Sequence, residues 1–130
     1  MKKIYVITIV LVGLLVLAAC GGAAEIPAGT WKLVSMNGRP VLEGADATIE
    51  FKDGQVSGFS GCNFFGGAYE QDGKSLKFGE LAMTLMACAD SGVMDQESAY
   101  MAALQAVDTV EVGENLLTLS GPEVELVYRQ

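Results

Sequence analysis

The chain has 130 residues, of which 8 are basic and 16 acidic, a formal net charge of -8 and no histidine. This length accommodates one domain with one hydrophobic core and is too short for two. The acidic balance argues against nucleic acid and against an anionic membrane surface as electrostatic partners. Without histidine, Ser-His-Asp triads, Cys-His pairs and histidine-containing zinc sites are excluded, and we expect neither a metal site nor a cofactor.

The first twenty residues have the pattern of a bacterial lipoprotein precursor. A short basic start precedes an apolar run from Ile4 to Leu17, which has the length of a signal-peptide core and is shorter than the roughly 20 residues of a membrane-spanning helix. Leu17-Ala18-Ala19-Cys20 then matches the lipobox, in which the cysteine is lipidated and becomes the new N-terminus. The alternative is a plain secretory signal, or an uncleaved anchor, with a coincidental cysteine.

These features divide the chain into three parts. We expect a lipoprotein signal peptide over residues 1–19, a lipidated N-terminus and flexible spacer over residues 20–28, and one domain over residues 29–130. Lipid on Cys20 would make a membrane the partner and place the domain in the cell envelope. Gly21 stands where an aspartate would favour inner-membrane retention, so the outer membrane is favoured in a Gram-negative cell.

The first half of the domain has the pattern of short strands joined by turns. We expect strands over residues 30–36 and 47–52, where apolar and polar residues alternate, and a connecting loop over residues 39–46. The dipeptides Asn37-Gly38 and Asp53-Gly54 are turn signals.

The stretch from Gly58 to Tyr69 determines how the rest of the domain is interpreted. It contains four glycines, three phenylalanines, a cysteine and an asparagine, and no charged residue. Glycine clusters of this kind mark left-handed turns, bulges or close approach of two backbones. We therefore expect a strand that enters at Val56, a bend at Gly61 to Asn63 and a second strand from Phe65 to Glu70.

The second half of the domain contains one helix among further strands. The expected elements are a turn at residues 71–73, a strand with Leu76 and Phe78 inward, an extended segment over residues 81–88, a helix over residues 94–107 with Asp90 or Ser91 near its N-cap, and strands over residues 110–112, 116–120 and 123–128.

Together these patterns predict an α+β fold with about eight short strands and one late helix. Because the helix interrupts a run of antiparallel hairpins instead of alternating with every strand, a doubly wound sheet is disfavoured. We expect a curved, mainly antiparallel sheet or partial barrel packed on the helix.

Two cysteines remain once Cys20 is assigned to lipid. Cys62 and Cys88 form an even pair in an oxidising compartment, so we expect a disulfide that stabilises the fold by roughly 3 to 4 kcal/mol. A reactive thiol at Cys62, or two buried reduced thiols, are the alternatives.

The expected helix carries one carboxylate among apolar residues. Glu97 shares a face with Tyr100 and Leu104, so we expect it to be buried. A buried carboxylate needs hydrogen-bond donors, and the backbone N–H groups around the Gly61 to Asn63 bend are candidates. Structural locking is one role for Glu97, and ligand binding is the alternative.

With these residues in place, the chain resembles the META domain family, which includes the HslJ-like heat-shock lipoproteins, over about residues 29–128. The resemblance rests on Trp31-Lys32-Leu33, Ile49, Phe51, Gly61-Cys62-Asn63, Phe65, Gly67, Tyr69, Thr84-Leu85-Met86-Ala87-Cys88, Glu97, Leu104, Leu117, Leu119 and Leu126. The motif residues among these are Gly61, Cys62, Asn63, Thr84 and Glu97. The resemblance implies the same α+β fold, an envelope lipoprotein with a role in stress or drug tolerance, novobiocin included, and no catalytic residue or cofactor.

Three functions compete. The first is a non-enzymatic, lipid-anchored domain that binds a protein or an apolar ligand. The second, by fold-level analogy alone, is a pilotin-like chaperone for a protein tail or an acyl chain, and an apolar cavity between sheet and helix would favour it. The third is an enzyme that uses Cys62 or carboxylates such as Asp90, Asp95 and Glu97, which would have to converge in a cleft.

Overall fold

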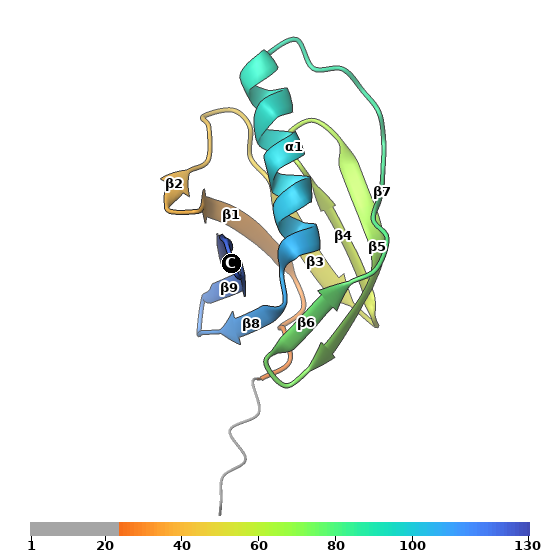
Figure 1. Cartoon of the computed structure of the whole chain (residues 1–130), viewed down its shortest axis with the longest axis vertical. Coiled ribbons are helices and arrows are strands. Elements are labelled where there is room, and N and C mark those ends of the chain that lie inside the picture. The colour runs from red at the N-terminus through yellow and green to blue at the C-terminus, as the bar shows by residue number, and fades with distance from the viewer. Residues whose placement is uncertain (1–23) are drawn as a thin grey trace, which may run out of the picture.

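The computed structural model describes residues 24–130, so the predicted signal peptide and the predicted lipobox with Cys20 lie outside the described residues. Over that range the chain forms ten strands and one helix (Figure 1). They are β1 (Thr30–Met36), β2 (Arg39–Pro40), β3 (Thr48–Lys52), β4 (Gln55–Phe59), β5 (Phe64–Asp72), β6 (Ser75–Phe78), β7 (Ala82–Met83), α1 (Ser91–Ala106), β8 (Thr109–Val112), β9 (Leu116–Gly121) and β10 (Val124–Arg129).

The eight longer strands form an antiparallel barrel. They follow one another in the order β10, β9, β8, β6, β5, β4, β3, β1, and β10 pairs back with β1. Between β6 and β8 a single residue pair, Ser75 with Thr109, makes the connection, so the barrel is nearly open there. The two-residue strands β2 and β7 are additions on β1 and β5. The prediction of an α+β fold with a partial barrel of about eight strands is confirmed.

The turn dipeptides act as expected in the first two hairpins. Asn37-Gly38 and Asp53-Gly54 all have positive φ, between 50° and 75°, the conformation that a two-residue hairpin turn requires. The third hairpin is displaced, because Asp72 pairs with Ser75 and the two-residue turn is Gly73-Lys74 instead of residues 71–73.

Helix α1 begins three residues earlier than its periodicity predicted. The Asp90 carboxylate accepts a hydrogen bond from the Gly92 N–H at 2.8 Å and caps the helix at Ser91. Gly92 and Val93 weaken the helical pattern in the sequence, but the cap starts the helix before them. Asp95 therefore lies beyond the first turn, where the helix dipole has little effect on it.

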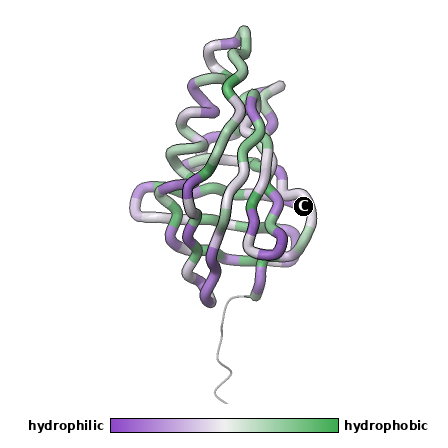
Figure 2. Tube along the Cα trace, turned by 90° about the vertical axis from the view of Figure 1, so that its right-hand side faces the viewer, coloured by the Kyte–Doolittle hydropathy of each residue, from purple (hydrophilic) through white to green (hydrophobic). Residues whose placement is uncertain are grey.

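Buried residues of α1 belong to the same hydrophobic core as the inward-facing residues of the strands. The Tyr100 ring lies 5.9 Å from that of Phe65 on β5, and its hydroxyl lies 3.0 Å from that of Tyr128 on β10. Strands β5 and β10 are four places apart in a ring of eight, so the helix contacts opposite walls of the barrel. Alternation of apolar and polar residues along the strands supplies the rest of this core (Figure 2).

Residues 24–28 pack against the barrel, within the span 20–28 for which the sequence predicted a flexible spacer. Ile26 is buried in the hydrophobic core. The Gln71 side-chain amide donates to the Ala24 carbonyl at 3.1 Å, and the Trp31 indole N–H donates to the Pro27 carbonyl at 3.1 Å. Burial of Ile26, the large aliphatic side chain of this segment, stabilises the packing of residues 24–28 against the barrel.

The expected loop over residues 39–46 is also partly ordered by pairing. Arg39 and Pro40 form β2, which turns back on Ser35 and Met36 of β1. Proline at such an edge position is tolerated because its missing N–H faces away from the ladder.

Candidate functional site

The bend between β4 and β5 meets α1 at a buried carboxylate. Glu97 is 2% exposed. One of its oxygens accepts the Asn63 main-chain N–H at 2.8 Å and the Ser60 hydroxyl, and the other accepts the Asn63 side-chain amide at 2.8 Å. We call Ser60, Asn63, Thr84 and Glu97 the Glu97 cluster.

The hydrogen bonds of the Glu97 cluster determine the charge state of the carboxylate. Burial raises the pKa of Glu97, but the hydrogen bonds from the side chains of Ser60 and Asn63 and from the backbone of Asn63 and Cys62 together outweigh it, so the pKa lies below its usual value of 4.5. Glu97 is therefore an anion at neutral pH and accepts hydrogen bonds without offering a proton. A general acid would need the opposite shift.

Asn63 connects the helix to the segment before it. Its side-chain oxygen accepts the Thr84 hydroxyl at 2.9 Å and the Met86 N–H at 2.7 Å, and its amide nitrogen also donates to the Met86 carbonyl at 3.1 Å. The Thr84 hydroxyl in turn accepts the Phe64 N–H at 3.1 Å. One side chain thus fixes the bend, the helix and residues 84–86 relative to each other.

A glycine and a disulfide complete this arrangement. Gly61 has φ of +104°, and a Cβ there would lie 3.2 Å from the Ala45 carbonyl oxygen, so the bend favours glycine on both counts. Cys62 and Cys88 are joined by a disulfide, with Cα atoms 6.1 Å apart and a sequence separation of 26. The bridge adds a covalent link where Asn63 supplies hydrogen bonds.

The structure brings together all the motif residues that the sequence singled out. Gly61, Cys62 and Asn63 form the bend, and Thr84 and Glu97 contact Asn63. Ser60 was missed, because a serine in a bend is ordinary at a surface position. Within residues 24–130, every buried side-chain nitrogen and oxygen has a hydrogen-bond partner, so this cluster presents no unpaired group to a ligand.

The other carboxylates proposed for an enzyme lie elsewhere. Asp90 caps the helix, and Asp95 is exposed on the face that lines a groove described below. Cys62 has no free thiol because it is in the disulfide. Over the part of the chain that the structure describes, no three residues among Asp, Glu and Cys converge as metal ligands.

Gln96 is a second polar side chain that the sequence reasoning missed. It is buried, its amide donates to the Ala45 carbonyl at 2.8 Å, and its carbonyl accepts the Leu42 N–H at 2.8 Å. It therefore fixes residues 42–45 against the helix, one residue away from the Glu97 contact with the bend. A polar residue beside an apolar stripe gives no sequence signal of such a role.

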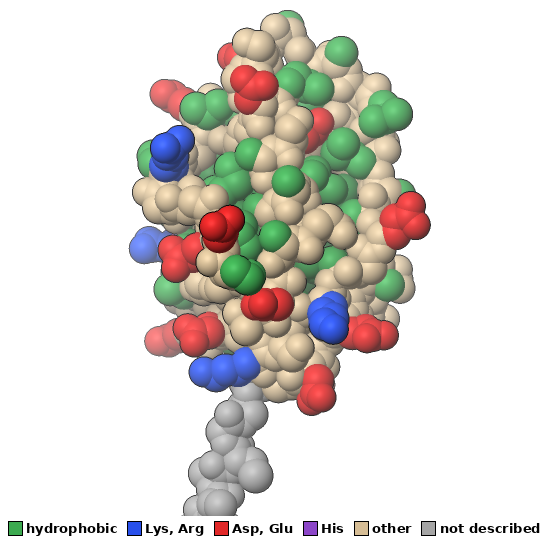
Figure 3. Space-filling view, in the orientation of Figure 1, with side chains coloured by type: hydrophobic (Ala, Val, Ile, Leu, Met, Phe, Trp, Pro, Cys, Tyr) green, Lys and Arg blue, Asp and Glu red, His purple; other side chains and the backbone are tan. Residues whose placement is uncertain are grey.

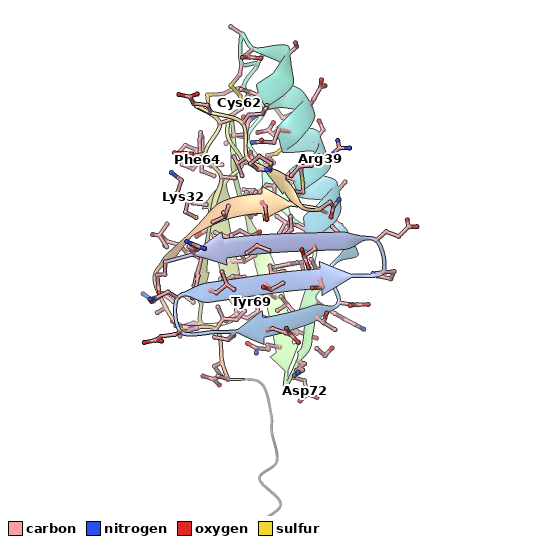
Figure 4. The ribbon with its side chains drawn as sticks, turned by 90° about the vertical axis from the view of Figure 1, so that its left-hand side faces the viewer. Lys32, Arg39, Cys62, Phe64, Tyr69 and Asp72 are labelled. Atoms are coloured by element: carbon pink, nitrogen blue, oxygen red, sulfur yellow. A yellow bond between two sulfur atoms is a disulfide. The ribbon has the colours of Figure 1, made fainter. Side chains whose placement is uncertain are left out.

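Next to the Glu97 cluster, three large apolar side chains are exposed. Leu85 is 90% exposed, Phe64 61% and Met86 54%. The Thr84 N–H donates to the Phe64 carbonyl at 2.9 Å, so the backbone of Thr84 lies beside that of Phe64. Leu85 and Met86 are the next two residues after Thr84 in the chain. We call these three residues the tip surface, and Phe64 lies in the same half of the molecule as Cys62 (Figure 4).

An apolar groove runs between the β1–β2 hairpin and the N-terminal half of α1. Its volume is about 690 Å³, and its apolar lining comes from Leu33, Met36, Val41, Leu42 and Ala99. Volumes in this range suit small apolar ligands or a few side chains of a partner. On the face that carries α1, hydrophobic side chains are frequent over the centre, and charged side chains lie mostly around its margin (Figure 3).

A more polar cleft of about 830 Å³ lies at the opposite end. It is lined by residues 25–28, by the β3–β4 turn and by the end of β5. Three carboxylates, those of Glu25, Asp53 and Asp72, face one lysine, Lys52, around it. Because residues 24–28 form one wall, the chain enters the domain beside this cleft.

Residues 24–130, which include the bend, the Glu97 cluster and the disulfide, match the family model for the META domain. The chain belongs to the META domain family. No curated protein sequence matches it.

Solved structures resemble this META domain. One NMR structure is 28% identical, covers 81% of this chain and 91% of its own, and superposes with a TM-score of 0.66. A second NMR structure, of a protein from Burkholderia xenovorans, is 28% identical, covers 82% and 91%, and has a TM-score of 0.64. The crystal structure of a DUF4847 family protein from Bacteroides vulgatus is 17% identical, covers 78% and 92%, and has a TM-score of 0.56, so it shares the fold.

Helix α1, the one helix in residues 24–130 of this META domain protein, is not both long enough and apolar enough to cross a bilayer.

Proposed function

We propose that this META domain protein is a lipid-anchored, non-enzymatic component of the bacterial cell envelope that binds a protein segment or an apolar ligand. The observation that carries the proposal is the apolar groove between the β1–β2 hairpin and α1. Within residues 24–130 every buried side-chain nitrogen and oxygen is paired, and a groove of this kind on such a domain is suited to binding. The lipobox at residues 17–20 supports the anchor, and the family resemblance supports a role in envelope stress or drug tolerance.

The position of the groove also supports a pilotin-like variant of this function. In that variant the groove accepts the tail of another protein or an acyl chain, because it lies between sheet and helix where such an extended apolar segment would fit. Arg39 on one side and Asp95 on the other give the groove no strong charge preference. The apolar lining therefore decides what binds.

An enzymatic function has less support, because three of the four residues proposed for it have structural roles and the fourth, Asp95, is exposed at the groove. Cys62 is in a disulfide, Asp90 caps a helix, and Glu97 accepts hydrogen bonds on both oxygens. A reactive group needs a free lone pair or proton in a cleft.

Two measurements on the full chain in its own cells test the proposal. Labelling with a radioactive or alkyne-bearing palmitate should mark the wild-type protein and leave the Cys20→Ala variant unmarked. Equal labelling of both forms, or of neither, would remove the lipid anchor from the proposal.

The groove is tested by a matched pair of helix variants in a strain that lacks the chromosomal copy. Ala99 and Ser98 are both exposed on α1, but Ala99 lines the groove and Ser98 does not. Growth in novobiocin should be restored by the wild type and by Ser98→Asp, and not by Ala99→Asp. If the two aspartate variants restore growth equally, the groove is not the binding site.

A further inference from the structure

We propose that the tip surface, Phe64, Leu85 and Met86, binds a segment of a second protein that supplies an apolar side chain flanked by basic residues. In this arrangement the end of the domain that carries the polar cleft faces the membrane, and the tip surface faces away from it. This inference rests on the lipid anchor proposed above and adds the orientation and the partner chemistry of a surface separate from the groove.

The chain enters the domain at the end opposite the tip surface. The Gln71 side chain, near the end of β5, donates to the Ala24 carbonyl, so the first described residue lies beside the β5–β6 hairpin. Asp72, in that hairpin, and Cys62, beside the tip surface, lie at opposite ends of the molecule (Figure 4). Phe64 of the tip surface and the first described residues therefore lie in opposite halves of the domain.

The short link to the anchor limits where the domain can go. Four residues from Cys20 to Ala24 span at most about 14 Å when fully extended. Helix α1, with 16 residues, is by itself about 24 Å long and runs lengthwise from the tip end (Figure 1). The tip surface can reach the anchoring bilayer only if the domain lies on its side.

Charge opposes that sideways position. The six basic residues of the chain after residue 19 stand against sixteen acidic ones. Two of the six, Lys32 and Lys74, already pair with Asp46 and Glu111. A long face carrying this excess of carboxylates would be repelled by anionic headgroups, so the tip surface points away from the membrane.

The exposed apolar residues of the tip surface are held in one conformation. Asn63 bonds both the N–H and the carbonyl of Met86, and Thr84 and Phe64 exchange hydrogen bonds on the other side of Leu85. The disulfide ties the end of this segment to the bend. A pre-formed apolar surface loses little conformational entropy when a partner binds.

A small pocket beside Phe64 indicates the chemistry of the partner. It has a volume of about 290 Å³, and its lining includes Phe59 and Phe64, whose ring centroids lie 5.0 Å apart, and Glu50, whose carboxylate accepts the Thr30 hydroxyl. That volume lies at the lower limit for small-molecule sites and fits one apolar side chain, and Glu50 favours a basic neighbour. Three side chains offer less than the about 800 Å² that each copy buries in a stable dimer, so a second copy fits less well.

The test is in-cell photo-crosslinking with the full chain. A benzophenone amino acid is placed at Leu85 in the tip surface and, as the matched control, at Asp72 at the other end. We expect Asp72 to crosslink to lipid, and Leu85 to crosslink to a different protein. Mass spectrometry should place that adduct on a peptide with an apolar residue next to Lys or Arg.

Charge reversal makes the result specific. Glu50 is exposed, so the Glu50→Lys variant should fold normally, which circular dichroism checks. This variant should lower the yield of the Leu85 adduct at least fivefold. The control Glu70→Lys, which lies outside the pocket, should leave the yield unchanged. A lipid adduct at Leu85, an adduct of two copies of this chain, no adduct, or equal effects of the two reversals would overturn the inference. If palmitate labelling of Cys20 is intact in the same cells, only this inference fails, whereas loss of labelling is a failure of the proposed function.

Discussion

Asn63 and Glu97 are 34 residues apart in the sequence, and the asparagine donates both its main-chain N–H and its side-chain amide to the two oxygens of the glutamate, each at 2.8 Å. The other side of the Asn63 amide binds Met86 and Thr84. The bend, the helix and the segment before the helix are thus held by one side-chain pair. Four predictions about stability follow from this arrangement and its surroundings.

Replacing Glu97 by glutamine should destabilise the domain. Glutamine is nearly isosteric, but its amide nitrogen cannot accept, so a donor from Ser60 or Asn63 is left unpaired in a buried place. We expect Glu97→Gln to lower the free energy of unfolding by about 1 to 3 kcal/mol in urea denaturation. The control Asp95→Asn, exposed on the same helix, should change it by less than about 0.5 kcal/mol. Equal effects of the two changes would show that the Glu97 bonds contribute nothing specific.

The same carboxylate makes stability depend on pH in the acidic range. Because the pKa of Glu97 is lowered on folding from its usual value of 4.5, its contribution is complete above that value and is lost as the pH falls through the lower folded pKa. Denaturation measured between about pH 6 and about pH 3 should show the wild type losing stability more steeply than Glu97→Gln, so that the gap between them narrows. A gap that stays constant down to the lowest pH would contradict the lowered pKa.

Removing the disulfide should destabilise the domain without unfolding its barrel. Cys62 and Cys88 close a loop of 26 residues, and the chain-entropy model predicts a loss of about 3 to 4 kcal/mol for the double alanine variant. Circular dichroism should keep the strand signal while the thermal midpoint falls. If the double variant and the wild type treated with a reducing agent unfold at the same point as the oxidised wild type, the bridge does not stabilise the fold.

Gly58 should be intolerant of a side chain. A Cβ at this position would collide with the Thr48 carbonyl oxygen and lie 2.6 Å from the Phe65 ring. We expect Gly58→Ala to cost about 1 to 3 kcal/mol in denaturation experiments, the usual range for overpacking. Gly79→Ala is the control, because a Cβ there meets its nearest atom, the Ala68 carbonyl oxygen, at an ordinary 3.5 Å. A neutral Gly58→Ala would mean that β3 and β5 are less closely packed around β4 than the structure has them.

Local sequence signals predicted most of the strands. Alternation at Ile49 and Phe51 and the turn dipeptides at residues 37–38 and 53–54 identify hairpins because side-chain direction and positive φ are local properties. The pairing of β10 with β1 was not predictable in the same way. It joins the first and the last strand in the sequence of the domain, and no local pattern encodes a register such as Leu33 with Tyr128.

The site was predicted in part for a similar reason. Glu97 stood out because a carboxylate on an apolar stripe must find donors, and the glycine-rich bend was the segment that could supply them. Ser60 and Gln96 gave no such signal, since a serine or a glutamine is ordinary at a surface position. Burial of Ile26 was missed because a short segment after a lipobox has no periodicity from which packing could be inferred.

The central claim is that the Glu97 cluster is a structural lock that holds the bend and the tip surface in one conformation. Amide hydrogen exchange of the wild type and of Glu97→Gln, followed residue by residue by NMR, tests it most directly. We predict that the N–H groups of Asn63 and Met86 are among the slowly exchanging amides in the wild type and that both exchange faster in the variant, while those of the β9–β10 hairpin change only with global stability. The claim would be contradicted if, in the wild type, the Asn63 and Met86 amides exchanged as fast as the amide of Gly73 in an exposed turn.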